Sequence, residues 1–325
     1  MLRSAPMRSV GTAEGGLIKP VDSESRLPLV RVEDPVVLEV APILQTEIRS
    51  SLDDLVSEHL HPERLLEADL VPTRTALFVG PPGVGKTLAA RWLAHELNRP
   101  LLILDLASVM SSLLGRTGEN VRRVLEYAKQ TQCVLLLDEL DAVAKRRDDA
   151  TEIGELKRLV TVLLQEIDAW PDGSLLLAAT NHASLLDPAV WRRFEIVVNF
   201  PLPEDEALAA AIREYLDDES IPENAIRPVA AAYRGYSYSD IRREVMRARR
   251  TAAIHGLPVL EALYSGVKDH FRKLAPTERV QLAMNLMADA GLSQRKTHEI
   301  TGVSRDTLRK YGADNLSTDE GVNCA

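Results

Sequence analysis

The sequence predicts an α/β domain, a parallel sheet covered by helices on both faces, followed by a region that is only helical. The first observation is a series of apolar runs that alternate with amphipathic helical stretches, at residues 75–79, 101–105, 133–137, 174–179 and 194–200. Short continuous apolar runs are typical of parallel strands buried on both faces. The second observation is that only helical periodicity continues after Glu204. Helical spacing of apolar residues from Ile43 to Leu60 predicts one more helix ahead of the first strand.

The composition is that of a soluble protein. Of the 325 residues, 45% are hydrophobic and 27% are charged, as in ordinary globular chains. No apolar run reaches the roughly 18 residues that a membrane-spanning helix needs, and the N-terminus lacks the apolar segment of a secretory signal. Two cysteines, Cys133 and Cys324, make no disulfide framework. We therefore expect a reduced, cytoplasmic protein without membrane contact.

Charge is unevenly distributed along the chain. The formal net charge of −9 argues against a nucleic-acid-binding surface over the whole protein. Residues 271–311 instead hold eight Lys and Arg against four Asp and Glu, a net charge of +4. This C-terminal segment is the part of the chain suited to a polyanionic partner.

The polar residues after the first apolar run form a phosphate-binding loop. The segment Gly80-Pro81-Pro82-Gly83-Val84-Gly85-Lys86-Thr87 lies between a predicted strand and a helical stretch, the order that a P-loop requires. Glycines let backbone N–H groups turn toward an anion, and the helix N-terminus adds partial positive charge. Lys86 can then reach the β- and γ-phosphates, and the Thr87 hydroxyl can bind Mg²⁺. We predict ATP and Mg²⁺ as ligands, with nucleotide contacts from Gly80, Pro82, Gly83, Val84, Gly85, Lys86, Thr87 and Leu88.

Two further predicted strands end in polar residues suited to the same chemistry. Asp138 and Glu139 follow the apolar run at 133–137. Because consecutive strand residues point to opposite sides, the two carboxylates need not share a role. Asp138 suits the Mg²⁺ shell, and Glu139 suits activation of the water that attacks the γ-phosphate. Asn181 follows the next run, where it orients that water, contacts the γ-phosphate or belongs to a plain turn.

Two adjacent arginines complete the candidate catalytic residues. Arg192 and Arg193 come at the end of a short predicted helix that begins near Asp187-Pro188. An arginine donated by a neighbouring subunit can stabilise the charge that develops during phosphoryl transfer. In isolation the same residues are also consistent with a solvated basic turn.

Together these motifs resemble the AAA clade of the AAA+ ATPases, across roughly residues 36–265. The motifs follow the family order: Walker A at 80–87, a pore-loop segment at 113–115, Walker B at 137–142, sensor 1 at 179–181, the arginines at 192–193 and the lid signature at 235–241. The resemblance implies a homo-oligomeric ring, usually a hexamer, with ATP between subunits and arginines acting in trans. It also implies that Ser239 lies beside the nucleotide where other AAA+ groups carry an arginine.

Three positions depart from the family pattern. The family separates its two arginines by Pro-Gly, whereas Arg192 and Arg193 are adjacent, so which one reaches the phosphate stays open. Asp168-Ala169-Trp170 stands in place of the intersubunit Asp-Gly-Phe. The pore loop has Leu113-Leu114-Gly115 in place of an aromatic triplet, and leucine offers less contact area to a threaded polypeptide. Packing beneath a helix is the alternative role of these leucines.

Residues 292–311 resemble a helix-turn-helix. Gly302 suits the positive-φ position of the turn, and Ser304 suits the cap of the second helix. Arg305, Arg309 and Lys310 then fall on a helix able to enter a major groove. Thr297 and His298 depart from the usual pattern of this motif. Both DNA binding and docking to a protein remain open for this unit.

These assignments divide the chain into five parts: a flexible N-terminal arm (1–35), a nucleotide-binding α/β domain (36–202), a helical lid (203–270), a helix-turn-helix-like domain (271–312) and a flexible tail (313–325).

Three functions are consistent with this organisation. The first is a ring-forming ATPase motor that remodels an unidentified protein or protein–nucleic-acid target, which the C-terminal unit selects. The second is an ATP-regulated DNA-binding regulator that assembles on DNA without threading a substrate. The third is an adaptor ATPase for a separate protease, because the metalloprotease pattern His-Glu-x-x-His does not occur in this sequence.

Overall fold

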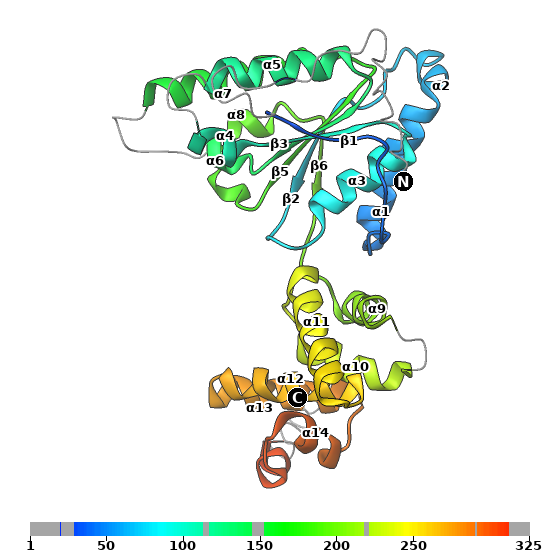
Figure 1. Cartoon of the computed structure of the whole chain (residues 1–325), viewed down its shortest axis with the longest axis vertical. Coiled ribbons are helices and arrows are strands. Elements are labelled where there is room, and N and C mark those ends of the chain that lie inside the picture. The colour runs from blue at the N-terminus through cyan, green and yellow to red at the C-terminus, as the bar shows by residue number, and fades with distance from the viewer. Residues whose placement is uncertain are drawn as a thin grey trace, which may run out of the picture.

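The computed structural model describes residue 20 and residues 29–112, 117–144, 153–217, 221–289 and 291–311. Figure 1 shows an α/β domain joined to a helical region that extends away from it. The leucines of the expected pore loop, Leu113 and Leu114, lie outside the described residues, as do the first nineteen residues and the tail after Tyr311.

A sheet with the strand order β1-β3-β4-β5-β2-β6 forms the centre of the α/β domain. The strands are β1 (Arg31–Glu33), β2 (Thr75–Val79), β3 (Leu101–Asp105), β4 (Val134–Asp138), β5 (Leu175–Thr180) and β6 (Ile196–Asn199). β2 to β6 run parallel and coincide with the five apolar runs of the sequence, which confirms the predicted fold class. Because β5 pairs with both β2 and β4, the P-loop strand is one strand removed from the strand that ends in Asp138.

Strands β2 to β5 are buried because each contributes to two cores. In β4, Leu135 and Leu137 pack with helices α5 and α7 on one face, whereas Val134 and Leu136 pack with α1 and α3 on the other. Figure 1 shows these two helical layers on opposite sides of the sheet. The helices of this domain are α1 (Thr46–Leu60), α2 (Pro62–Leu66), α3 (Lys86–Glu96), α4 (Leu106–Ser112), α5 (Thr117–Gln130), α6 (Asp141–Ala144), α7 (Ile153–Asp168) and α8 (Pro188–Trp191), with a 3₁₀ turn η1 (Ala183–Leu185).

The structure corrects the expected flexible arm at its C-terminal end. Residues 31–33 form β1, which pairs antiparallel with β3, Arg31 opposite Ile103 and Glu33 opposite Leu101. A charged strand of three residues has no periodicity that the sequence could reveal. It forms because β3 would otherwise present an unpaired edge.

Helices alone build the rest of the described chain. They are α9 (Asp205–Leu216), α10 (Glu223–Ala232), α11 (Tyr238–His255), α12 (Val259–Lys273), α13 (Pro276–Asp289), α14 (Gln294–Thr301) and a final helix at residues 305–311. The boundary expected at residue 270 lies inside α12. One hydrophobic core runs through the region, from Leu208 in α9 past Phe271 in α12 to Leu308 in the final helix.

Candidate functional site

The loop between β2 and α3 is held against two other parts of the protein. A Cβ at Gly80 would lie 2.0 Å from the backbone oxygen of Phe200, so only glycine fits this close approach. Gly83 has φ +80°, and a Cβ there would lie 2.5 Å from Ser237 Oγ in the lid. Pro82 is exposed at the loop apex, Val84 is buried in the core, and Gly85 precedes the first residue of α3. Contacts with Phe200 on one side and with Ser237 on the other therefore fix the conformation of the loop without a ligand.

Lys86 is the buried cation of the loop. Its Nζ donates hydrogen bonds to Gly80 O at 2.6 Å, Pro81 O at 2.9 Å and Asn181 Oδ1 at 2.8 Å. Burial lowers the pKa of Lys86, while the carboxylates of Asp138 and Asp141 act in the opposite direction. All three ammonium protons are thus held by neutral acceptors, which anionic phosphate oxygens can replace with a gain in Coulomb energy.

Thr87 and Asp138 form an oxygen pair beside this lysine. Thr87 Oγ1 donates to Asp138 Oδ2 at 3.2 Å, although the two residues come from α3 and the end of β4. A hydroxyl and one carboxylate fit Mg²⁺, which commonly takes few protein ligands and completes its shell with phosphates and water. In the part of the chain that the structure describes, no group of three or more His, Cys, Asp or Glu is arranged to hold a metal alone.

Glu139 lies at the acidic end of the sheet. Partial desolvation raises its pKa, and the carboxylates of Asp105, Asp138 and Asp141 raise it further. Its backbone adopts φ +56°, a left-handed conformation that costs a non-glycine residue of order 1 kcal/mol or more. This conformation turns the chain away from β4 directly after Asp138, so the two carboxylates occupy different positions. A carboxylate with a raised pKa is suited to accept a proton from water.

Two acidic residues of this edge were not among the predicted site residues. Asp141 Oδ1 accepts hydrogen bonds from Thr180 Oγ1 at 2.9 Å and from the Asn181 amide at 3.1 Å, and so positions the end of β5. Asp105 lies opposite Asp138 in the register of β3 and β4. Asp141 belongs to the Walker B segment, so its place near Asp138 could have been predicted from the sequence. The place of Asp105 depends on strand pairing, so the sequence could not predict it.

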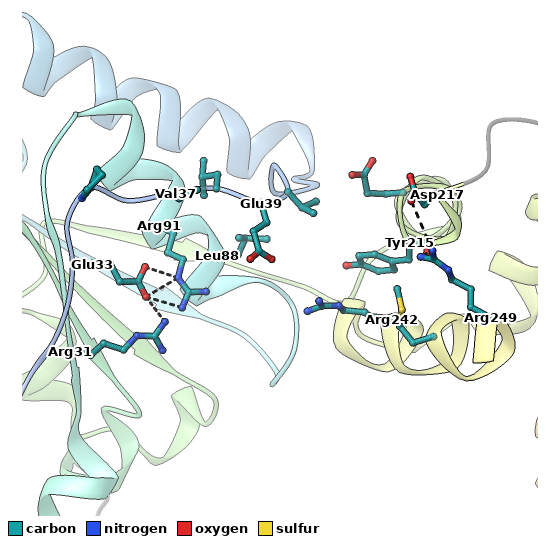
Figure 2. Close-up of a pocket in the computed structure, with 15 residues that line it drawn as sticks. Arg31, Glu33, Val37, Glu39, Leu88, Arg91, Tyr215, Asp217, Arg242 and Arg249 are labelled. Carbon is teal, nitrogen blue, oxygen red and sulfur yellow. Dashed lines mark hydrogen bonds and ion pairs between the residues drawn. The ribbon is translucent and has the colours of Figure 1, made fainter. Parts of the chain in front are cut away.

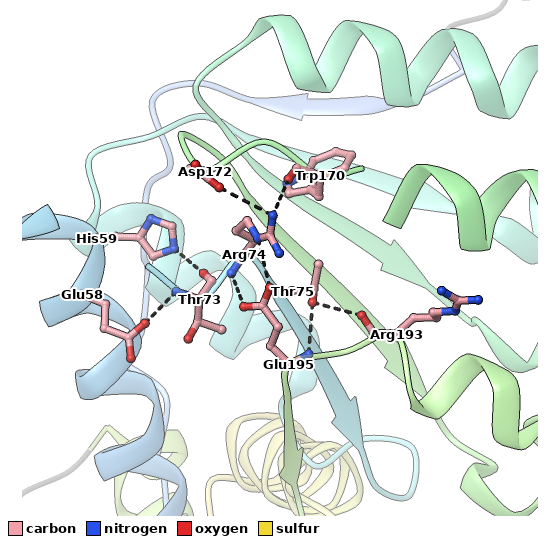
Figure 3. Close-up of polar contacts among 9 residues, drawn as sticks. All are labelled: Glu58, His59, Thr73, Arg74, Thr75, Trp170, Asp172, Arg193 and Glu195. Atoms are coloured by element: carbon pink, nitrogen blue, oxygen red, sulfur yellow. Dashed lines mark hydrogen bonds and ion pairs between the residues drawn. The ribbon is translucent and has the colours of Figure 1, made fainter. Parts of the chain in front are cut away.

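Arg192 and Arg193 lie at the opposite edge of the sheet from the P-loop. They precede β6, which runs parallel to β2, and Thr75 Oγ1 at the start of β2 donates to Arg193 O at 3.3 Å. Figure 3 shows Arg193 and Glu195 beside these first residues of β2. The length of β2, about 13 Å at ~3.3 Å per residue, therefore separates this turn from the loop that begins at Gly80. The arginine turn and the phosphate loop of one chain therefore lie at opposite ends of β2.

The two arginines have different surroundings. The guanidinium of Arg193 pairs with Asp168, the acid of the segment 168–170. Arg192 is exposed, and no acid in the described part of the chain pairs with it. Two hydrogen bonds of Glu195 hold the backbone that follows the two arginines. Arg74 Nε donates to Glu195 Oε1 at 3.0 Å, and the Glu195 amide donates to Thr75 Oγ1 at 3.1 Å. Arg192 is thus the freer of the two side chains.

A cavity of about 830 Å³ adjoins the loop on the lid side. Leu88 and Arg91 of α3 line it from the α/β domain, and Tyr215 and Arg242 line it from the lid, as Figure 2 shows. Arg91 binds Glu33 of β1 through hydrogen bonds of 2.9 to 3.2 Å. Because Leu88 directly follows Thr87, this cavity begins next to the phosphate loop.

The lid contacts the loop through the start of α11. The Ser239 amide donates to Gly83 O at 3.2 Å. Ser237 caps α11 in a capping box with Asp240, which fixes the helix N-terminus against the loop. The predicted residues thus fall into two groups: one set converges at the carboxyl edge of the strands with Ser239 above it, and the arginines lie at the other edge.

Comparisons with known proteins show which families the chain resembles. Residues 76–202 match the family described as "ATPase family associated with various cellular activities (AAA)". An uncharacterised AAA family ATPase of Sinorhizobium fredii, y4kL, is 38% identical over 200 residues, 62% of this chain and 60% of that protein. The ATP-dependent zinc metalloprotease FtsH of Acidothermus cellulolyticus is 32% identical over 256 residues, 73% of this chain and 38% of that protein. The proteasome-activating nucleotidase of Pyrococcus abyssi is 32% identical over 189 residues, 56% of this chain and 48% of that protein.

The chain therefore spans less than two thirds of the length of each of these relatives. Among its described helices, none has both the length and the apolar character needed to cross a bilayer.

Proposed function

We propose that this chain, whose residues 76–202 match the AAA family of ATPases, is an ATPase that works as one subunit of a homo-oligomeric ring. In this ring, ATP is hydrolysed between neighbouring subunits. The hydrolysis remodels a protein or protein–nucleic-acid target. The resemblance to the AAA clade favours six subunits.

One observation carries the proposal: the site is divided between two edges of the sheet. At the carboxyl ends of the strands, Lys86 Nζ donates to Asn181 Oδ1, and the adjacent Thr87 donates to Asp138 Oδ2. Arg193 O is bonded to Thr75 at the other edge. A single subunit cannot bring these groups together across the sheet. A ring of identical subunits can, because each contact places the arginine turn of one subunit against the phosphate loop of the next.

Each residue of the site has a task in this scheme. Lys86 binds the β- and γ-phosphates, and Thr87 with Asp138 holds Mg²⁺, whose charge stabilises the transferring phosphoryl group. Glu139 accepts a proton from the attacking water. The backbone amide of Asn181 donates to Asp141, which positions Asn181. The Asn181 side chain accepts from Lys86 Nζ and lies where the γ-phosphate binds. Arg192 or Arg193 of the next subunit stabilises the transition-state charge.

The target is proposed from weaker support. Two relatives are named for proteolysis, a zinc metalloprotease and a proteasome-activating nucleotidase, which favours a protein as part of the target. The C-terminal helices, the helix-turn-helix-like unit, select that target. A second candidate is an ATP-regulated DNA-binding regulator, and the exposed basic residues Arg305, Arg309 and Lys310 favour it. In both cases the C-terminal unit determines where the ATPase works.

The variant Glu139→Gln tests the site and the ring together. It keeps the shape of the side chain but removes the proton acceptor, so we expect ATP to remain bound while turnover falls by ~10²–10⁴-fold. The bound ATP should hold subunits together as a ring, which size-exclusion chromatography with light scattering measures. Glu96→Gln, an exposed position on α3, is the matched control.

Either half of the proposal can fail separately. Hydrolysis at the wild-type rate in Glu139→Gln removes the role assigned to Glu139. A variant that binds ATP but stays monomeric at all concentrations tested removes the ring.

A further inference from the structure

The last two helices form a rigid, outward-facing unit. α14 ends at Thr301, and Gly302 adopts φ +73°, so the chain turns into the helix at residues 305–311 after three residues. His298 Nδ1 lies 2.8 Å from Val303 O, and the Thr307 amide donates to Ser304 Oγ at 3.1 Å. Both sides of the turn are therefore fixed by hydrogen bonds, the second being an N-cap.

One face of the helix at residues 305–311 holds it to the protein. Leu308 is fully buried, and it shares a core with Ile300 of α14 and Val303 of the turn. The other face is exposed and carries Arg305 and Arg309 one turn apart, with Lys310 beside them. Burial of Leu308 thus determines which side chains point outward.

The exposed basic residues of this helix have no acidic partners among the described residues. No acid in the described residues pairs with Arg305, Arg309 or Lys310, nor with Arg295 on α14. Elsewhere in the helical region, several exposed arginines pair with acids, although Arg242 and Arg250 do not among the described residues. The pairs are Arg213 and Arg227 with Glu223, Arg234 with Asp205, Arg243 with Asp240 and Arg272 with Asp269. The positive charge of this face is therefore available to an anionic partner.

The chemistry of the face favours a nucleic acid over a protein. Protein interfaces have an apolar centre and are depleted in lysine. Here the only large apolar side chain exposed among residues 291–311 is Tyr311, 48% exposed at the end of the helix. Figure 1 places α13 and α14 at the end of the helical region that is remote from the sheet, which leaves this end accessible to a long rod-shaped ligand.

We propose that the C-terminal helices bind duplex DNA, with the helix at residues 305–311 in the major groove. Arg305 and Arg309 face base edges, where an arginine can bind guanine through two hydrogen bonds. Arg295 and Lys310 contact flanking phosphates, which positions the helix. This assignment rests on the proposed function, because it identifies DNA as the nucleic-acid part of the target on which the ATPase acts.

Fluorescence anisotropy with the full chain and a labelled mixed-sequence duplex of roughly 30 bp tests the proposal. We expect binding at about 50 mM KCl that weakens ~10-fold at about 200 mM, as the two phosphate contacts of Arg295 and Lys310 would give. The double variant Arg305→Ala/Arg309→Ala should weaken binding at least ~10-fold. The control Arg227→Ala/Arg272→Ala removes the same charge from exposed arginines elsewhere and should change affinity less than about twofold.

ATP hydrolysis measured on the same samples separates this proposal from the proposed function. Unchanged hydrolysis in both double variants is expected, since neither touches the ATP site. If the wild-type chain hydrolyses ATP but does not bind the duplex at the low salt concentration, the proposal is overturned and the face belongs to a protein partner. Equal loss of affinity in the test and control variants also overturns it. Absence of hydrolysis in the wild-type chain contradicts the proposed function alone.

Discussion

The α/β domain and the helical region are organised in opposite ways. The α/β domain has one sheet, but its predicted site residues lie in two separate places: Lys86 follows the carboxyl end of β2, and the arginine turn lies beside the start of β2. The helical region looks like two domains in the sequence, a lid and a C-terminal unit. Its residues nevertheless form one core, which includes Phe271 of α12 and Leu286 of α13.

The difference follows from how strands and helices bury their side chains. All strands of a parallel sheet begin on one side and end on the other. Residues next to the two ends of β2 are therefore separated by the length of that strand. Packed helices bury apolar residues along their whole length, so α12 continues across the expected boundary without a break. Because the lid and the C-terminal helices share one core, a movement of the lid would carry the C-terminal helices with it.

Mixing two inactive variants tests the divided site and has the largest expected effect. Lys86→Ala removes the phosphate-binding cation, and Arg192→Ala/Arg193→Ala removes the arginines, so each alone should lose ~10³-fold or more in turnover. A one-to-one mixture restores some interfaces in which the intact loop of one subunit meets the intact arginines of the other. Random assembly makes about a quarter of the interfaces complete, and a steady-state ATPase assay measures their recovery.

The control for this experiment is a mixture of Lys86→Ala with a chain that carries all three changes. That mixture has no intact phosphate loop and should stay inactive. If the first mixture also stays at the level of its separate components, the arginines do not act in trans.

A cavity-forming substitution in α13 tests whether the helices of the lid and the C-terminal helices unfold together. Leu286 is fully buried, so Leu286→Ala should destabilise the region by about 3–5 kcal/mol. Hydrogen exchange followed by mass spectrometry should show faster exchange in α10 to α12 as well as in α13 and α14. Leu257→Ala, at a position that is 43% exposed, is the matched control. Unchanged protection of α10 to α12 in the Leu286 variant would mean that the C-terminal helices fold separately.

The smallest effect concerns His59, a buried histidine in α1 of the α/β domain. Its Nε2 lies 2.8 Å from Thr73 O and its Nδ1 accepts from Arg99 at 3.2 Å, an arrangement that requires the neutral ring. Burial lowers the pKa of His59 below its usual 6.5. The unfolded chain therefore binds the proton more readily than the folded one. Stability present above pH 6.5 should decline as the pH falls, by up to ~1.4 kcal/mol per pH unit.

Denaturant unfolding at several pH values between about 5 and 7 measures this decline. His59→Gln can keep one donor and one acceptor but does not titrate, so its stability should depend less on pH. An equal pH dependence in both proteins would assign the acid sensitivity to other groups, such as His270 in the lid, whose pKa burial also lowers.

Much of the fold and the candidate site was predictable because the signals are local. The five parallel strands were recognisable as apolar runs, and the loop from Gly80 to Thr87 was recognisable from its spacing. β1 was not predictable, because three residues with two charges form a strand only beside an available edge. Asp105 was missed because its place beside Asp138 depends on the pairing of β3 with β4.

The order of residues alone establishes which chemistry this protein carries: a phosphate loop, two adjacent carboxylates, an arginine pair and a basic C-terminal helix. These features depend on covalent neighbours, which every conformation of the chain retains. Only the tertiary structure decides that β5 brings Asn181 beside Lys86, that the arginines lie at the far edge of the sheet, and that Leu308 and Phe271 share a core. Those relations arise from strand pairing and helix packing between segments far apart in sequence, and no local pattern specifies them.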